Sequence, residues 1–286
     1  MKKVALATYN RLPNLKEDDR LVIDHLLRHG VKAEALVWDC DPQRLDEFDC
    51  CVIRSCWDYH LRPEEFLSWV RKVEARGVVL WNPADVVEWN TDKVYLRELE
   101  GRGIFIPPTV WIARGSEANL REILDRQGWN HAVVKPTISA TAYRTWVTSR
   151  EEAQSHQKNF EELLSESGVM VQRFIEEVKT RGEWSFMFFA NEYSHAVLKR
   201  AKAGDFRVQD DFGGYTEQVT PSSDLIEQAK RIVDVVGEKL LYVRVDGVDI
   251  DGELRLMELE LIEPLLFLGQ SDTAPKRFAD AIVSFL

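Results

Sequence analysis

The chain has 286 residues, of which 45% are hydrophobic and 30% charged. This composition is typical of a soluble globular protein rather than a disordered or fibrous one, and the length is that of about two domains. Lys and Arg number 37 against 48 Asp and Glu, which gives a formal net charge of −11. That acidic excess excludes a broad basic face, so we expect neither a nucleic acid nor an anionic membrane as a partner.

Targeting and redox signals are weak. No stretch reaches the roughly 20 consecutive apolar residues of a membrane span, and the apolar run after Lys2 and Lys3 is too short for a signal peptide. The cysteines crowd between residues 40 and 56 without CxxC spacing or a matching histidine set. Reduced thiols are therefore favoured over a zinc site or a disulfide framework, and we expect a cytoplasmic protein.

The first 80 residues alternate short apolar strands with helices. The run FDCCVIR at 48–54 is apolar almost throughout, as in a strand buried on both faces. Strand–helix–strand repetition with short connections predicts a parallel sheet with helical crossovers. The expected strands are 4–8, 33–38, 48–54 and 78–81, and the expected helices are 18–29 and 63–76.

Beyond residue 82 the pattern changes. Helices are expected first, and from Val169 onward β character dominates, with antiparallel hairpins. The sequence therefore predicts an α/β front half and an α+β back half. The expected strands are 104–113, 132–135, 169–174, 183–190, 192–198, 242–250 and 253–262, and the expected helices are 93–100, 117–127, 150–166, 224–238 and 276–285.

The strongest local signal is the segment ELRLMELELIEP at 253–264. Alternate residues of an extended chain share a face, so Glu258 and Glu260 lie on one face of an otherwise apolar strand. Two neighbouring carboxylates repel each other and resist burial, and a divalent cation relieves both problems. Carboxylates with phosphate oxygens completing the shell suit Mg²⁺. The alternative is a half-solvated strand that simply carries acids.

A third acid, Asp246, lies in the preceding strand, and the connection contains Asp251-Gly252. A strict two-residue turn there pairs residue 246 with residue 257 and directs Asp246 to the wrong face. A three-residue loop with a left-handed Gly252, or a bulge, pairs 246 with 258 instead, and the three acids converge. The metal site therefore requires an odd loop or a bulge in this hairpin.

Isolated cations form a second signal. Lys93 follows WNTD, Lys135 ends an apolar strand in VVKP, and Lys199 ends another in SHAVLKR, with Arg200 and Arg207 after it. In an acidic protein they fit a cradle for a polyphosphate, in which Arg207 supplies a planar fork. For each cation alone, a solvated surface residue is the simpler interpretation. The chain has neither a Walker loop nor a GxGxxG fingerprint, so a bound nucleotide would use neither.

The segment VQRFIEE at 171–177, followed by Gly182-Glu183, is a third signal. An apolar strand that leads into polar residues can offer backbone groups to an adenine edge, and an acid a few residues later can hold ribose hydroxyls. A plain strand end is the alternative. No Ser-His-Asp or Cys-His constellation is recognisable, and His195 lies inside an expected strand, where a structural role is favoured.

Substrate contacts are expected where the buried strand FDCCVI ends, because ligands of open parallel sheets bind beyond the carboxyl ends of the strands. Arg54 can fix a substrate carboxylate, and Asp58 can hold an ammonium. Trp57 and Tyr59 can wall the pocket. The alternative is a buried Arg54–Asp58 pair that pins the loop. Two weaker candidates further along the chain are Asp205 and Gln209.

Seven segments, taken in order, resemble the ATP-grasp superfamily, whose metal-site pattern is acid–Leu–acid and a later Pro, with an Asp on the strand before. The closer resemblance is to the glutathione-synthetase-like branch, in particular the group that contains O-ureido-serine cyclo-ligase, a cycloserine-forming ligase. It includes the N-terminal segments 52–69 and 82–93. The seven segments are NTDK (90–93), VVKP (133–136), VQRFIEEV (171–178), GEWS (182–185), SHAVLKR (194–200), GDFRVQ (204–209) and DGVDIDGELRLMELELIEP (246–264).

The resemblance implies an ATP-grasp fold, of mixed α/β and α+β character, with an N-terminal parallel-sheet (pre-ATP-grasp) domain. Three parts follow from it: a substrate domain at 1–82, an ATP-grasp lid subdomain at 83–170, and a C-terminal subdomain with the metal site at 171–286. One departure is the segment TISATAYRTW at 137–146, which has no glycine where many members carry a glycine-rich flap.

The resemblance also implies roles for single residues. Lys93 and Lys135 would contact the ATP phosphates, Gln172, Phe174 and Ile175 the adenine, and Glu183 the ribose; Asp246, Glu258 and Glu260 would hold two Mg²⁺; Lys199 and Arg207 would face the transferred phosphate or an acyl phosphate.

The implied activity is an ATP- and Mg²⁺-dependent carboxylate–amine ligase that acts through an acyl phosphate on an amino acid, a small peptide or a related metabolite. One alternative is an intramolecular cyclo-ligase of the O-ureido-serine type, and another is an ATP-binding module or kinase without ligase activity. The expected partners are small-molecule acids and amines, and a homo-oligomer is compatible with the sequence.

Overall fold

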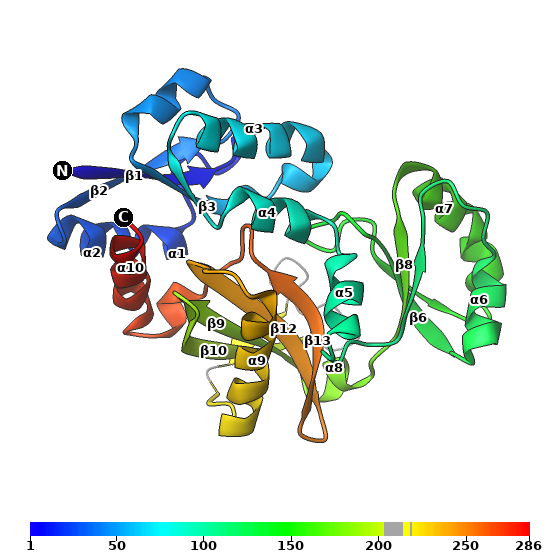
Figure 1. Ribbon diagram of the computed structural model, residues 1–286. Coiled ribbons are helices and arrows are strands. Elements are labelled where there is room, and N and C mark those ends of the chain that lie inside the picture. The colour runs from blue at the N-terminus through cyan, green and yellow to red at the C-terminus, as the bar shows by residue number, and fades with distance from the viewer. Residues whose placement is uncertain (203–213, 218) are drawn as a thin grey trace.

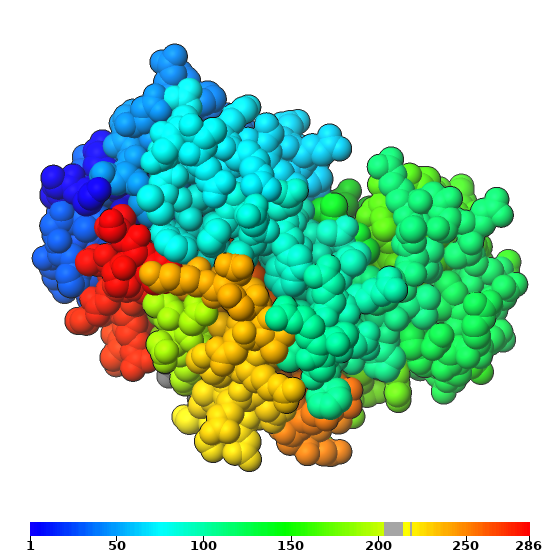
Figure 2. All heavy atoms as spheres, viewed as in Figure 1, coloured from blue at the N-terminus to red at the C-terminus, as the bar shows by residue number. Residues whose placement is uncertain are grey.

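The structure is a computed structural model that describes residues 1–202, 214–217 and 219–286. The described residues form three sheets of four, four and five strands. In the space-filling view the surface is indented between the cyan part of the chain and the green part (Figure 2). Among the described residues, no helix has both the length and the apolar character needed to cross a membrane.

The N-terminal sheet is parallel, as predicted, with strand order β2-β1-β3-β4. Alternate residues of β1 pack into two separate clusters: Val4 and Leu6 with α2 and α10, Ala5 and Ala7 with α3 (Figure 1). The sheet is thus buried on both faces, which explains its continuous apolar runs. Its elements are β1 (Lys2–Thr8), α1 (Glu17–Arg20), α2 (Ile23–Arg28), β2 (Val31–Val37), η1 (Pro42–Glu47), β3 (Cys50–Ser55), η2 (Tyr59–Leu61), α3 (Pro63–Ala75) and β4 (Val79–Trp81).

The helix predicted at 18–29 is wrong in one respect, because it is divided into α1 and α2. The division places Asp19 at the end of β3, where its carboxylate accepts hydrogen bonds from Arg54 and Ser55. A buried polar contact with residues about 35 positions away is not visible in a helical periodicity.

A second, antiparallel sheet has the order β5-β8-β6-β7 and is covered by α6 and α7 (Figure 1). Helix α4 and strand β7 were not among the predicted elements. Because β8 pairs within this sheet, the expected domain boundary at 170/171 falls inside a strand. The elements are α4 (Ala84–Thr91), α5 (Tyr95–Gly101), β5 (Thr109–Ile112), α6 (Leu120–Gln127), β6 (His131–Pro136), β7 (Trp146–Ser149), α7 (Ala153–Glu166) and β8 (Val169–Arg173).

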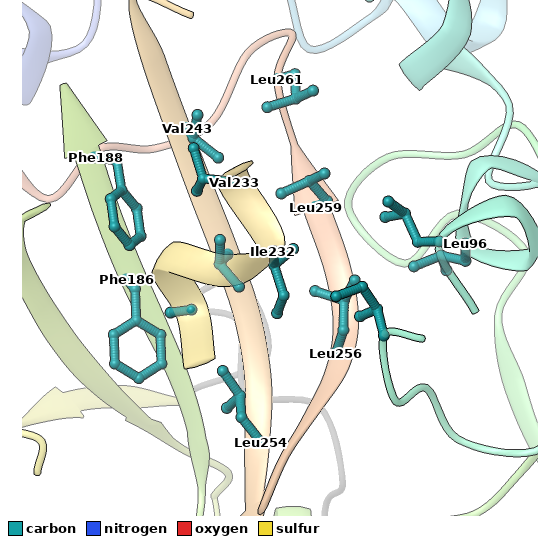
Figure 3. Close-up of a cluster of buried hydrophobic side chains, with 14 of the residues drawn as sticks. Leu96, Phe186, Phe188, Ile232, Val233, Val243, Leu254, Leu256, Leu259 and Leu261 are labelled. Carbon is teal, nitrogen blue, oxygen red and sulfur yellow. The ribbon is translucent and has the colours of Figure 1, made fainter. Parts of the chain in front are cut away.

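The third sheet is antiparallel along β10-β9-β12-β13, with β11 beside β10. Helix α9 crosses one face and buries Ile232 and Val233 against Phe186 and Leu256 (Figure 3). Full burial of such a side chain contributes about 1.5–3 kcal/mol. The elements are α8 (Glu177–Thr180), β9 (Glu183–Phe189), β10 (Glu192–Arg200), β11 (Tyr215–Glu217), α9 (Ser223–Val236), β12 (Tyr242–Ile250), β13 (Glu253–Glu260), η4 (Leu268–Gln270) and α10 (Ala274–Ser284).

The β12–β13 hairpin has a two-residue turn and a bulge. Asp251 and Gly252 both have positive φ, 54° and 89°, as a type I′ turn requires. The register then shifts between Asp246 and Gly247, so that residue 246 pairs with 258 and residue 247 with 256. Met257 is the extra residue. The predicted 246–258 pairing is therefore confirmed, and the bulge rather than a longer loop produces it.

The connection between the first two sheets is fastened to the last strand. Asn90 donates to the carbonyl of Leu259 and accepts from the amide of Leu261, and the Tyr95 hydroxyl also binds the Leu259 backbone. These buried contacts fix Lys93, which lies between Asn90 and Tyr95, at the edge of β13.

Candidate active site

A cavity of about 300 Å³ lies where the three sheets meet. Its walls come from β6 and β8 of the second sheet, from β9, β10, β12 and β13 of the third, from the segment 139–145, and from the loop after β3. Most of the site residues predicted from sequence line it: Trp57, Tyr59, Lys93, Lys135, Gln172, Phe174, Ile175, Glu183, Lys199, Asp246, Glu258 and Glu260.

Asp246 is the most strongly held acid of the cavity. Its carboxylate is buried and accepts from the Ser185 hydroxyl at 2.5 Å, the Lys199 ammonium at 3.1 Å and the Arg244 guanidinium at 2.8 Å. Burial by itself would raise the pKa of Asp246, but the positive charges of Arg244 and Lys199 outweigh burial and lower this pKa to about 2. Asp246 is therefore a permanent anion at neutral pH.

Glu258 and Glu260 have opposite electrostatic environments although they share a strand face. Glu258 pairs with Lys93 at 2.9 Å, and the charges of Lys93 and Lys135 lower its pKa in spite of burial. Glu260 contacts Arg244, yet burial is the largest influence and raises its pKa to about 7. The face thus holds one firmly ionised carboxylate beside one that titrates near neutrality.

The remaining predicted nucleotide contacts lie around this acidic face. Lys199 also pairs with Glu183 at 2.5 Å. Burial lowers the pKa of Lys135. The buried Gln172 amide donates to Thr109 at 3.0 Å, and Ile175 packs with other apolar side chains at the far end of β12. Several cations and an apolar recess therefore occupy one cavity.

Arg54 and Asp58 lie elsewhere, and the predictions that made them substrate contacts find no support. Among the described residues neither lines the cavity. Arg54 is buried and donates to Asp19 at 2.9 Å and to the Pro264 carbonyl at 2.8 Å. Asp58 accepts from the Trp38 indole and from Arg62, each at 2.8 Å. The alternative, an Arg54–Asp58 pair, is wrong, because each partner is satisfied by another residue.

Three predicted residues, Asp205, Arg207 and Gln209, lie outside the described residues. The cavity residues that were not predicted include Arg244, Glu263 and Ser139. Arg244 was recoverable from sequence, because a residue two positions before Asp246 on a strand shares its face. Ser139 contributes its carbonyl, which accepts from the Lys93 ammonium at 2.6 Å.

The glycine-free segment 137–146 borders the cavity and forms tight turns without glycine. Thr141, Ala142 and Arg144 all have φ near +50°, a conformation that costs roughly 1–2 kcal/mol for each L-residue. Thr141 and Ala142 line the cavity. The Tyr143 ring lies 5.2 Å from the His60 ring of the N-terminal part. The segment thus lines the cavity and contacts the N-terminal part of the chain.

The acids provide the hard oxygen donors that Mg²⁺ prefers. In the part of the chain that the structure describes, no three His, Cys, Asp or Glu side chains are grouped closely enough to hold one metal ion. Each acid is paired with a cation instead: Asp246 with Lys199 and Arg244, Glu258 with Lys93, and Glu260 with Arg244. The three carboxylates suit Mg²⁺ as ligands if Lys93, Lys199 and Arg244 pair with other anions instead of with them.

Comparison with solved structures gives the class of this fold. The D-alanine–D-alanine ligase from Bacillus anthracis complexed with ATP has a TM-score of 0.72 at 16% identity, covering 99% of this chain and 97% of that one. The ATP-grasp ligase PsnB, complexed with minimal precursor, Mg and ADP, has a TM-score of 0.65 at 16% identity, covering 99% and 96%. The chain has the ATP-grasp fold.

More similar proteins give the family. A sequence profile described as "D-cycloserine synthetase DcsG, N-terminal domain" matches residues 4–82. The cycloserine biosynthesis protein DcsG of Streptomyces lavendulae is 31% identical over 272 residues, 90% of each protein. The crystal structure of D-cycloserine synthetase DcsG has a TM-score of 0.88 at 29% identity, covering 99% of both chains. The chain belongs to the DcsG family of ATP-grasp ligases.

Proposed function

We propose that the protein joins a carboxylate to an amine at the expense of ATP, through an acyl phosphate, with release of ADP and phosphate. One observation carries this proposal: a single cavity brings together buried lysines, a buried arginine and acids of the metal-binding pattern. The family relationship supports the same activity.

The cations are proposed to bind phosphate. Lys93 and Lys135 approach the acidic face from the second sheet and its connection, and they would contact the ATP phosphates. Phosphate oxygens would also replace Glu258 as the partner of Lys93. Gln172, Phe174 and Ile175 would hold the adenine, and Glu183 the ribose.

The acids are proposed to hold two Mg²⁺. Asp246, Glu258 and Glu260 would ligate them together with phosphate oxygens. When bound, the ions supply positive charge to the phosphate oxygens during transfer. This proposal accounts for an otherwise unfavourable feature, two neighbouring acids on a buried strand face.

Arg244 and Lys199 are proposed to stabilise the negative charge that develops while the acyl phosphate forms and while it breaks down. Both are buried and fixed by Asp246, so their charges are preorganised and need little reorganisation during the reaction. Arg207 would act with them. The segment 137–146 would exclude water from the acyl phosphate.

The reaction needs no side-chain nucleophile. Among the described residues, His195 does not line the cavity; its Nε2 faces the carbonyls of Leu266 and Phe267. The two carbonyls accept from Nε2, and Nδ1 accepts from the Ser194 hydroxyl at 3.0 Å. Burial raises the pKa of the Cys51 and Cys56 thiols and makes thiolates unfavourable.

The substrate is proposed to be an amino acid, a small peptide or a related metabolite. The relationship to D-cycloserine synthetase favours the narrower form in which acid and amine belong to one molecule and a ring closes. We further propose that the chain has three parts, 1–82, 83–170 and 171–286, with β8 of the last part completing the sheet of the middle part, and that it acts in the cytoplasm.

An ADP-release assay tests the proposal. The protein is incubated with ATP, Mg²⁺ and a panel of acids and amines, and with O-ureido-D-serine alone. ADP release that needs both an acid and an amine supports intermolecular ligation, and release with O-ureido-D-serine alone supports ring closure. ATP binding without turnover on any acid would contradict a ligase. Omission of Mg²⁺ should abolish turnover.

A further inference from the structure

One buried carboxylate of the cavity has no role in the reaction proposed above. Glu263 follows β13, lines the cavity, and is 9% exposed. In residues 1–202, 214–217 and 219–286, no side chain forms an ion pair or a hydrogen bond with its carboxylate; the hydrogen bond that lowers its pKa comes from its own backbone amide. Burial, with the nearby charges of Glu260 and Glu258, raises the pKa of Glu263 far above its usual range.

Hydrogen bonds from side chains fix the backbone on both sides of Glu263. Each carbonyl from residue 262 to residue 265 accepts a hydrogen bond from a side chain of another element. A backbone held at four successive residues leaves its side chains little freedom, which is how binding groups are preorganised. The donors to residues 262, 263, 264 and 265 are Tyr242, Trp57, Arg54 and Arg244, at 2.7, 3.1, 2.8 and 3.1 Å.

The surroundings of Glu263 favour a cation. Trp57 and Tyr59 line the cavity beside it, and the Trp57 indole already lies 5.4 Å from the ammonium of Lys16. Aromatic faces attract ammonium groups, and the attraction grows where water is excluded. A carboxylate buried without a partner is unfavourable, and an ammonium brought by a ligand removes that cost.

We propose that Glu263 binds a protonated amine of the acid substrate, so that the protein selects acids that also bear an ammonium. This inference rests on the proposed ligase function and assigns a residue to the recognition of the substrate's amine. The cavity would then orient such a substrate by charge: its carboxylate toward Arg244 and Lys199, and its ammonium toward Glu263 and the two aromatic rings.

Paired ligands and the variant Glu263→Gln test the inference. Calorimetry in the presence of ADP and Mg²⁺ compares O-ureido-D-serine with 3-(ureidooxy)propanoate, and D-alanine with propanoate, so that each pair differs only in the amine. We expect the native protein to bind at least one amine-bearing acid about tenfold or more tighter than its counterpart, since a charge-assisted hydrogen bond is lost. Glu263→Gln should abolish that ratio while its affinity for ADP stays unchanged.

The matched control is Glu253→Gln, the same substitution on β13 at a carboxylate that pairs with Arg255 outside the cavity. It should keep the native ratio. A native protein that binds no amine-bearing acid more tightly than its counterpart overturns the inference. A Glu263→Gln protein that keeps the native ratio of the two affinities also overturns it. Loss of thermal stability in this variant with an unchanged ratio would mean that Glu263 pairs within the chain.

The ligase proposal can fail separately. A native protein that shows the amine preference in calorimetry but releases no ADP with any acid would contradict the ligase and support the role of Glu263. Equal ADP release with amine-bearing and amine-free acids would support the ligase and contradict the role of Glu263.

Discussion

Two buried arginines, Arg54 and Arg244, illustrate how similar ion pairs serve different purposes. Arg54 is 1% exposed and Arg244 is 8% exposed, and each is paired with an aspartate at 2.8–2.9 Å. They even donate to successive carbonyls, those of Pro264 and Leu265. Arg54, however, lies outside the cavity lining, whereas Arg244 is part of it.

The difference lies in how completely each charge is compensated. Asp19 has Arg54 and Ser55 as donors, and the group fastens β3 to α1 and to the loop after β13. Arg244 instead serves Asp246 and Glu260 at once, in a wall that carries further acids and lysines. A buried pair is costly to break in either case. Only the second cluster has charges that a bound polyphosphate could take over.

The largest expected effect is at the acidic face. Glu258→Gln should lower Mg²⁺-dependent turnover by about 10³-fold, because it removes a proposed metal ligand. ADP release measures the loss, and a thermal melt checks that the protein is folded. Glu253→Gln, on the same strand but outside the cavity, should leave turnover within about twofold. Unchanged activity of Glu258→Gln would remove this residue from the metal site.

Breaking the first arginine pair should affect stability and leave chemistry alone. Asp19→Asn should reduce the free energy of unfolding by about 3 kcal/mol, because it leaves Arg54 buried without its anion. Urea titration measures this, and kcat well below the melting temperature should stay near the native value. A large fall in kcat with native stability would place Arg54 in the active site after all.

Changing the second arginine should give the opposite pattern. Arg244→Lys keeps the charge but loses the planar fork that serves Asp246 and Glu260 together. We expect kcat to fall about 10²-fold, as for other preorganised charges of a transition state, with little change in the KM for ATP. A fall in stability equal to that of Asp19→Asn, with native kcat, would make the two arginines equivalent.

Acid should weaken the packing of β10 against the loop after β13. Burial lowers the pKa of His195 below its ordinary 6.5, so the unfolded chain binds a proton at a pH where the folded chain does not. The free energy of unfolding should therefore fall as pH drops below about 6.5, by at most about 1.4 kcal/mol per pH unit for this one proton. Urea titrations of the native protein and of His195→Gln at several pH values measure it. A native curve parallel to that of the variant would contradict this assignment.

Local patterns were sufficient for most strands of the three sheets, though not for β7 or β11, and for the group of acids and cations. Alternation along 253–260 predicted the shared face of Glu258 and Glu260, and the requirement for an odd loop or a bulge followed from Asp246. The position of that bulge at Met257 was not predictable, because Gly247 also matters: a Cβ there would lie 2.8 Å from the Arg255 carbonyl. Such close packing depends on the folded hairpin.

Long-range partners account for the failures. Arg54 looked like a ligand contact because it ends a buried strand, but its partner Asp19 lies in a helix whose break the periodicity conceals. Glu263 was not among the predicted site residues, because it follows the expected strand 253–262 and its position depends on Trp57, Tyr242 and Arg54 from other elements. These contacts form only when the first and third sheets meet.

The most direct test of the central claim follows an oxygen atom. An acid found to support turnover is labelled with ¹⁸O in its carboxylate, and the released phosphate is analysed by ³¹P NMR. If the cavity activates the acid as an acyl phosphate, one ¹⁸O passes from the acid to each phosphate. Release of ADP with unlabelled phosphate would contradict the account, because ATP would then be hydrolysed without activation of the carboxylate.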